Sequence, residues 1–220
     1  MLRTLSLALA LCVTCLGSTH AADVDLFGNL GTVSTTTTSN TVGYLSGSQP
    51  NQFQSQGFTV GSTAYVLSRI DLGLGSTGTP SPVVSIYSNS GTNPGTSLAN
   101  FTTTSTVANK QVYSFTGSYT LSANTNYWIV LSNTNSASQE SYEWYTNDAF
   151  SPPTAKNSSG VTYLGTKEKN GTGGTWTDAI PSLSINVAGT AVPEPSTYAL
   201  GLIATGVLAA MARRRKTRTA

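Results

Sequence analysis

Residues 140–148 hold the side chains best suited to chemistry, because three carboxylates stand there among three aromatic rings. They are Glu140, Glu143 and Asp148, with Tyr142, Trp144 and Tyr145. A glycosidase needs two carboxylates flanking a sugar, and aromatic rings can stack on sugar rings. One hypothesis is therefore a carboxylate-dependent glycoside hydrolase that uses Glu143 with Glu140 or Asp148. The other is a carbohydrate-binding module whose exposed aromatics are drawn from Tyr142, Trp144, Tyr145 and Trp176.

The element that positions these side chains is a strand over residues 142–146. Successive side chains of a strand point to opposite faces, so Tyr142 and Trp144 share one face and Glu143 lies on the other, with Tyr145. If the aromatic rings pack into the core, Glu143 is an ordinary exposed carboxylate. We take this as the simpler interpretation and expect no catalytic residue and no enzymatic activity.

Other catalytic chemistries are limited by the residues that the chain lacks. The only histidine and both cysteines, His20, Cys12 and Cys15, precede Ala21. These residues lie in a predicted signal peptide, described below. Once it is removed, the chain has no Ser-His-Asp triad, no thiol nucleophile and no zinc site built on His or Cys. Asp71 and Asp148 could join backbone carbonyls around calcium, but no Asp-x-Asp-x-Asp pattern supports such a site. We therefore expect neither a metal nor a cofactor.

The first residues have the pattern of an export signal. A short positive start at Arg3 precedes an apolar run from Leu5 to Gly17, and Thr19-His20-Ala21 places small residues at a cleavage site. This pattern predicts a signal peptide over residues 1–22, removed by signal peptidase. Residues 23–191 then carry five basic and eight acidic residues, a net charge of −3. Such a balance disfavours nucleic-acid binding.

The middle of the chain alternates short apolar runs with Gly, Pro and Asn turns, which is typical of β-structure. Expected strands lie at residues 23–30, 53–60, 65–74, 83–87, 98–103, 112–116, 127–131, 142–146, 161–164 and 183–187. Residues 127–131 are apolar on both faces and indicate a central strand buried on both sides. The fold class we expect is all-β, an antiparallel β-sandwich of jelly-roll type. The sandwich would span residues 41–190, after an N-terminal strand or linker at 23–40.

The C-terminal residues form a module of three parts. Val192-Pro193-Glu194-Pro195-Ser196-Thr197 cannot join a helix or a central strand, because each proline fixes φ and lacks an N–H donor. An uncharged apolar run from Tyr198 to Ala212 follows, then Arg213, Arg214, Arg215 and Lys216. Its 15 residues are fewer than the roughly 20 of a straight transmembrane helix, so we expect a marginal single span. The basic cluster would stay cytoplasmic by the positive-inside rule.

This module resembles the PEP-CTERM sorting signal of Gram-negative bacteria, over residues 191–220. The resemblance implies processing by a membrane-embedded exosortase at the motif formed by Val192, Pro193, Glu194, Pro195 and Ser196. It further implies loss of the helix and delivery to the cell surface or an extracellular polysaccharide matrix. Residues 41–189, with Val83–Asn89, Asn93-Pro94-Gly95 and Asn126–Leu131, resemble the β-rich "choice-of-anchor" ectodomains. That likeness implies a surface domain and no catalytic residue.

These observations together predict an exported protein, anchored briefly in the inner membrane and then placed at the cell surface or in the matrix of a biofilm. Its expected work is structural or adhesive. Its expected partners are signal peptidase and exosortase during export, and an extracellular polysaccharide afterwards.

Overall fold

The computed structural model of the chain describes residues 22–30, 39–43, 51–77, 82–107, 110–133, 141–146, 151–179 and 182–193, with 204, 206 and 207. By their contacts, residues 1–190 form one compact unit and residues 191–220 a second. Only 204, 206 and 207 of the predicted apolar helix fall within this description, so the helix stays a prediction. The residues described include no helix long and apolar enough to cross a membrane. The predicted signal peptide lies outside them, except Ala22.

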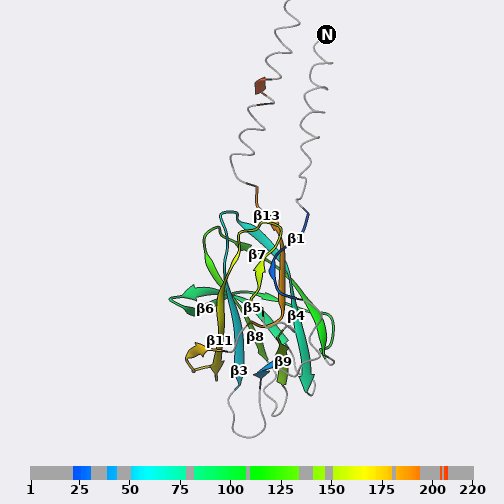
Figure 1. The fold of residues 1–220 in the computed structure, drawn as a ribbon, viewed down its shortest axis with the longest axis vertical. Helices are drawn as coiled ribbons and strands as arrows, with labels where there is room; N and C mark the ends of the chain where they lie inside the picture. Colours follow the sequence, from blue (N-terminus) through cyan, green and yellow to red (C-terminus); the bar gives the residue numbers. More distant parts are fainter. Residues whose placement is uncertain are drawn as a thin grey trace, which may run out of the picture. The chain divides into compact units, whose positions relative to one another are not determined.

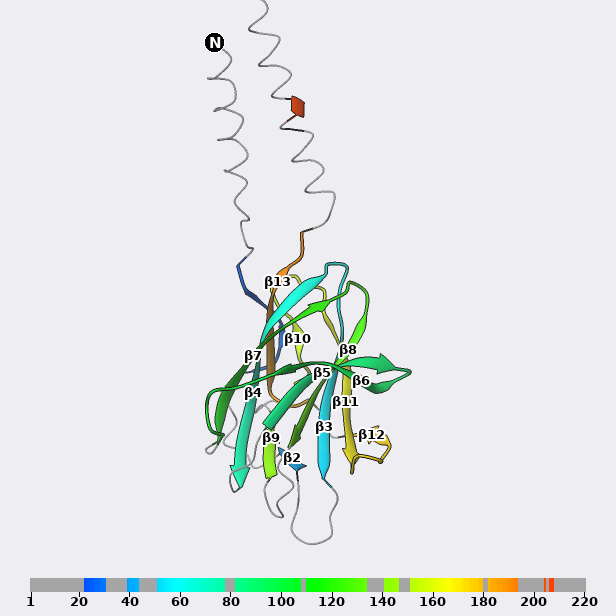
Figure 2. The same cartoon turned by 180° about the vertical axis from the view of Figure 1, so that it is seen from behind.

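The described strands form an antiparallel β-sandwich of two layers (Figures 1 and 2). The first layer contains β1 (Val24–Gly28), β2 (Ser39–Gly43), β4 (Tyr65–Thr77), β7 (Gln111–Leu121), β9 (Ser141–Tyr145), β10 (Thr154–Ala155) and β13 (Ile185–Ala191). The second contains β3 (Gln52–Thr59), β5 (Pro82–Ser90), β6 (Asn93–Phe101), β8 (Asn126–Asn133), β11 (Thr162–Asn170) and β12 (Trp176–Asp178). A pairing of Gly43 with Gln52 links the layers through β2 and β3, and a bridge between Thr102, just after β6, and Thr116 of β7 links them again.

Within the first layer, β13 lies between β1 and β4, and β4 carries β7 on its other edge. Val24 pairs with Gly189, so the start of β1 stands beside the end of β13. Residues 24–28 therefore belong to the body of the sheet, although their sequence indicated only an N-terminal strand or linker. In the second layer β8 is central, with β3 and β5 as its neighbours.

The core fills the space between the two layers with aromatic and branched side chains. The Phe27 ring on β1 meets the Phe58 ring on β3 with centroids 5.7 Å apart, and Phe58 meets Tyr127 on β8 at 6.1 Å. Ile70 and Leu72 of β4 are fully buried on the same core. Burying each such side chain contributes about 1.5–3 kcal/mol, so this contact between the layers stabilises the sandwich.

The predicted fold class is confirmed, since the described chain is almost entirely antiparallel β-structure. The central strand expected at residues 127–131 is also confirmed, because all five side chains are buried within β8. Residues 39–40, predicted as part of the N-terminal strand or linker at 23–40, begin β2, which pairs with β9. This strand was not predicted, because Ser39-Asn40-Thr41 has no apolar alternation.

In the second layer, the Trp128 ring on β8 packs closely against the backbone of Gly57 on β3. Trp128 is 1% exposed, and its Nε1 donates a hydrogen bond to Asn89 Oδ1 at 2.8 Å. A Cβ added to Gly57 on β3 would stand 2.8 Å from two ring carbons of Trp128. The ring is held by its hydrogen bond and by burial, so it cannot move aside without cost.

Gly57→Ala should therefore lower the free energy of unfolding by about 1–3 kcal/mol, the usual cost of overpacking. The measurement is urea denaturation followed by tryptophan fluorescence. Gly173→Ala is the matched control, because a Cβ there meets no atom within 4 Å. Equal stabilities for the two variants would contradict the described contact between Gly57 and Trp128.

Candidate functional site

The junction between the last strand and the C-terminal module is the first candidate site. β13 ends at Ala191, and its residues are buried from Ile185 to Gly189 and partly exposed after that. Val192 is partly exposed and Pro193 is exposed. Proline lacks the N–H that a ladder needs, so the strand has to end before residue 193. The described start of the motif is thus accessible backbone directly after a buried strand.

A buried carboxylate fixes β13 to its neighbours. Asp71 on β4 has a side chain only 10% exposed, and both of its oxygens accept hydrogen bonds. Ser114 Oγ on β7 donates to Oδ1 at 2.6 Å, and Asn186 Nδ2 on β13 donates to Oδ2 at 3.3 Å. Arg69 Nε pairs with Oδ2 at 3.0 Å. The charge is thus satisfied by three donors from three strands, as a buried charge requires.

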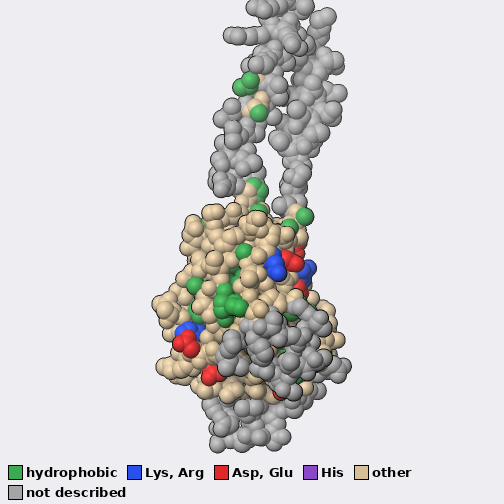
Figure 3. All heavy atoms as spheres, in the orientation of Figure 1, with side chains coloured by type: hydrophobic (Ala, Val, Ile, Leu, Met, Phe, Trp, Pro, Cys, Tyr) green, Lys and Arg blue, Asp and Glu red, His purple; other side chains and the backbone are tan. Residues whose placement is uncertain are grey.

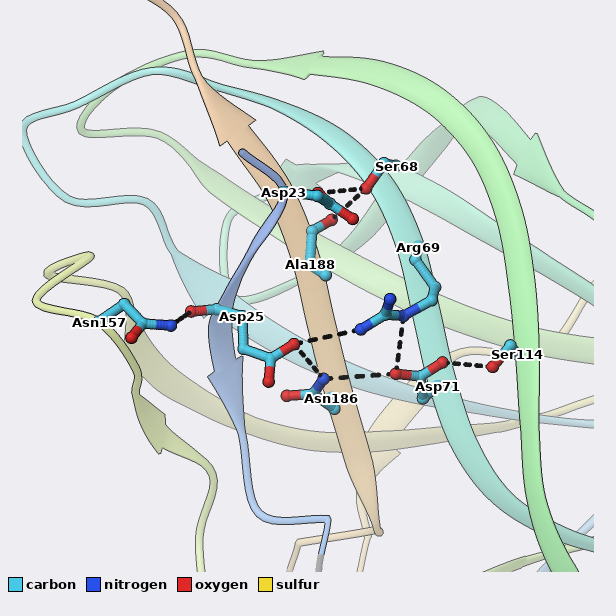
Figure 4. Close-up of polar contacts among 9 residues, drawn as sticks. All are labelled: Asp23, Asp25, Ser68, Arg69, Asp71, Ser114, Asn157, Asn186 and Ala188. Atoms are coloured by element: carbon cyan, nitrogen blue, oxygen red, sulfur yellow. Dashed lines mark hydrogen bonds and ion pairs between the residues drawn. The ribbon is translucent and has the colours of Figure 1, made fainter. Parts of the chain in front are cut away.

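Arg69 and Asn186 also contact a second carboxylate, that of Asp25 on β1 (Figure 4). Arg69 Nη2 lies 3.3 Å from Asp25 Oδ1, and Asn186 Nδ2 donates to that oxygen at 2.7 Å. Beside it, Ser68 Oγ donates to Asp23 Oδ1 at 2.7 Å. We call Asp25, Arg69, Asp71, Ser114 and Asn186 the polar clasp. It joins β1, β13, β4 and β7 side by side.

The side chains of the polar clasp are engaged in contacts with one another that hold strands together. Its two carboxylates face one guanidinium and one amide, and every oxygen of Asp71 already has a donor. Among the residues described, no group of three or more His, Cys, Asp or Glu side chains could hold a metal ion. Sequence reasoning treated Asp71 only as a calcium candidate. The alternation of Arg69 and Asp71 on one strand face was the available signal for an ion pair.

The carbohydrate-binding prediction was wrong for Tyr142 and Trp144, because both side chains are fully buried. Trp144 Nε1 donates to Ser184 O at 2.9 Å, which joins β9 to the start of the last strand. The predicted alternation itself is correct, since Glu143 and Tyr145 lie on the other, partly exposed face. The core takes the aromatic face because burying two large rings stabilises the sandwich more than stacking them against solvent.

Glu143 and Tyr145 form a pair rather than a free carboxylate beside a ring. The Tyr145 hydroxyl donates to Glu143 Oε2, and Lys110 Nζ lies 4.1 Å above the Tyr145 ring. Burial, and then the hydrogen bond and negative charge of Glu143, raise the pKa of Tyr145 to about 12. The hypothetical catalytic partners Glu140 and Asp148 lie outside the described residues.

Trp176 is partly exposed but already has a partner. Lys169 Nζ lies 5.1 Å from the Trp176 ring and 4.6 Å from the Phe53 ring. Burial between them lowers the pKa of Lys169. The ring face that a sugar would need is thus partly occupied by a lysine of the adjacent strand β11. Glu194, Pro195 and Ser196, with Arg213, Arg214, Arg215 and Lys216, lie outside the described residues.

Comparison with known families identifies the C-terminal module. The PEP-CTERM protein-sorting motif matches residues 191–216. The match begins at the residue where β13 ends. The chain therefore carries an exosortase sorting motif, which marks an exported protein sorted to the cell surface. No curated protein matches the chain in a sequence search.

Removing the buried carboxylate should destabilise the sandwich. Asp71→Ala removes the acceptor of Ser114 Oγ and one of the two carboxylates that face Arg69 and Asn186, so we expect the free energy of unfolding to fall by about 2–3 kcal/mol. Urea denaturation measures the change. Asp178→Ala is the control, because that carboxylate pairs with Lys167 while 89% exposed and should change stability by less than about 1 kcal/mol. Equal losses would contradict a structural role for the polar clasp.

The raised pKa of Tyr145 predicts a loss of stability in alkali. An unfolded tyrosine ionises near pH 10, whereas Tyr145 in the fold keeps its proton to a pKa of about 12. The stabilisation is complete below about pH 10 and is lost as the pH rises through the pKa of the folded state. Tyr145→Phe should therefore lose less unfolding free energy than the wild type across this range.

Denaturation at successive pH values measures that difference, and absorbance titration of tyrosinate identifies the late-ionising group. Glu143→Gln is the matched variant, since it keeps an acceptor and removes the negative charge. It should move the transition to lower pH. Identical alkaline profiles for wild type and Tyr145→Phe would refute the assignment.

Proposed function

We propose that this chain is a non-catalytic protein of the cell surface or extracellular matrix, with a structural or adhesive role. The single observation that carries the proposal is the sorting motif that starts where the last strand of the sandwich ends. In this account the C-terminal module holds the exported chain at the inner membrane until exosortase removes it. The β-sandwich is the part that remains outside.

The structure at the end of β13 is compatible with cleavage at the sorting motif. An enzyme that cuts a membrane-held chain needs an exposed segment, and Pro193 supplies one directly after a buried strand. The polar clasp ties that strand to β1 and β4. Cleavage at the motif would therefore leave the sandwich intact, because none of the described core contacts lies beyond Ala191.

The surface of the domain supports a structural role over a catalytic one. The face drawn in Figure 3 is mostly neutral, and its charged side chains stand in small separate groups. The carboxylate with the best catalytic prospects, Glu143, is held by the Tyr145 hydroxyl. A neutral surface rich in Ser, Thr and Asn can pack beside hydrated polysaccharide without repulsion between like charges.

A glycoside hydrolase stays the alternative function. It would use Glu143 as acid or nucleophile, so Glu143→Gln would abolish the release of reducing sugar from matrix polysaccharide. Any hydrolysis that Glu143→Gln leaves unchanged would exclude this residue from catalysis.

The mature form of the protein in its native host tests the proposal. Intact mass should place the first residue at Ala22 or Asp23 and the last residue between Val192 and Thr197. Fractionation should place this species outside the cell. The reason is that signal peptidase removes the first segment and exosortase removes the tail.

A chain that ends at Ala191 by design is the control, because it should be exported without an intermediate in the inner membrane. A full-length tail found permanently in the inner membrane would contradict sorting and indicate a tethered periplasmic domain.

A further inference from the structure

A hollow lies between the β5–β6 hairpin and the turn that joins β7 to β8. Its volume is about 510 Å³, and it is a shallow depression largely open to solvent. Tyr119 supplies a partly exposed aromatic ring, Tyr127 one that is only 5% exposed, Leu98 an apolar side chain, and Asn89, Asn124 and Asn126 amides. None of these residues belongs to the junction at residues 191–193, to the polar clasp or to the aromatic cluster at residues 142–145.

The lining carries no charged side chain. Burial raises the pKa of Tyr119, and the neighbouring Tyr127 raises it further, so this hydroxyl is neutral at physiological pH. A neutral wall disfavours phosphate, carboxylate and metal ions as ligands, because no side chain in it supplies an opposite charge. A wall with one leucine is also too polar for a lipid or an apolar peptide. Amides and hydroxyls match a ligand that both donates and accepts hydrogen bonds.

The polar groups of the hollow are held in place. Thr59 Oγ1 donates to Asn126 Oδ1 at 2.7 Å, which leaves the Asn126 NH₂ group as a donor. Trp128 Nε1 fixes Asn89, and Ser122 N donates to the Tyr127 hydroxyl at 3.1 Å. Fixed side chains lose little entropy when a ligand binds, so an ordered wall favours recognition.

Two features of the hollow suit a sugar ring in particular. Leu98 keeps 39% of its surface exposed, and the rings of Tyr119 and Tyr127 stand edge to face with centroids 6.0 Å apart. Asn124 has a positive φ of 53° in the turn, and no described hydrogen bond engages its side-chain amide. Asparagine is one of the few non-glycine residues that adopt this conformation readily in a turn.

We propose that this hollow binds a neutral sugar unit of a polysaccharide, with the ring against Tyr119 and Leu98 and its hydroxyls bonded by Asn124 and Asn126. The proposal rests on the proposed function for the source of the sugar, the extracellular matrix. The binding itself does not require the tail to be processed.

A glycan array of neutral and uronic-acid oligosaccharides tests the proposal with the full chain, purified in a detergent without a sugar headgroup. The wild type should bind neutral oligosaccharides and leave the uronic acids unbound. Asn124→Gly removes one amide and suits the positive φ, so it should weaken binding about fivefold with the fold retained. Tyr119→Ala should weaken it by about threefold to tenfold.

Matched variants elsewhere separate binding from folding. Ser158→Gly changes another residue of positive φ, at 56°, and Leu164→Ala changes a leucine 41% exposed, close to the value for Leu98. Both should bind as the wild type does, whereas Leu98→Ala should bind less tightly. Absence of any neutral oligosaccharide binding, or unchanged binding by Asn124→Gly and Tyr119→Ala, would overturn the proposal. Either result leaves sorting untouched, because sorting is measured by mass and fractionation.

Discussion

The position of β13 is the constraint on which the rest of the structure depends. The last strand of the sandwich is an interior strand, hydrogen-bonded to β1 on one side and β4 on the other. Its buried stretch ends within three residues of the sorting motif, and the polar clasp fixes it through Asn186. An edge strand at this place could be peeled away with the tail, whereas an interior strand cannot leave without breaking two ladders. This interior strand therefore ends where the sorting motif begins.

Much of the fold could be predicted from the sequence, because burial imposes regular patterns. The run Tyr127–Leu131 indicated a strand buried on both faces, and the alternation at residues 142–145 gave the correct faces. Alternation alone does not say which face is inside, so the same pattern allowed an exposed Tyr142 and Trp144. It also cannot show a bulge. The ladder of β4 and β7 shifts between Leu67 and Arg69, and strict alternation does not continue through that point.

The polar clasp and the hollow were beyond sequence reasoning, because they join residues far apart in the chain. Asn186 and Asp25 are separated by 161 positions, and their hydrogen bond exists only because β1 pairs with β13. The hollow needs two connections, the β5–β6 hairpin and the β7–β8 turn, to stand side by side. The sorting module is the opposite case. It is contiguous, so its residues alone identified it.

Native-state hydrogen exchange of the β13 amides tests most directly the claim that the last strand is locked into the sheet up to the sorting motif. We predict that amides of residues 185–189 exchange only through global unfolding, with the same free energy as those of the central strand β8. Exchange of β13 through local opening, while β8 stays protected, would contradict a last strand that is locked into the sheet. It would mean that the junction frays and that the tail is not attached to a fixed strand.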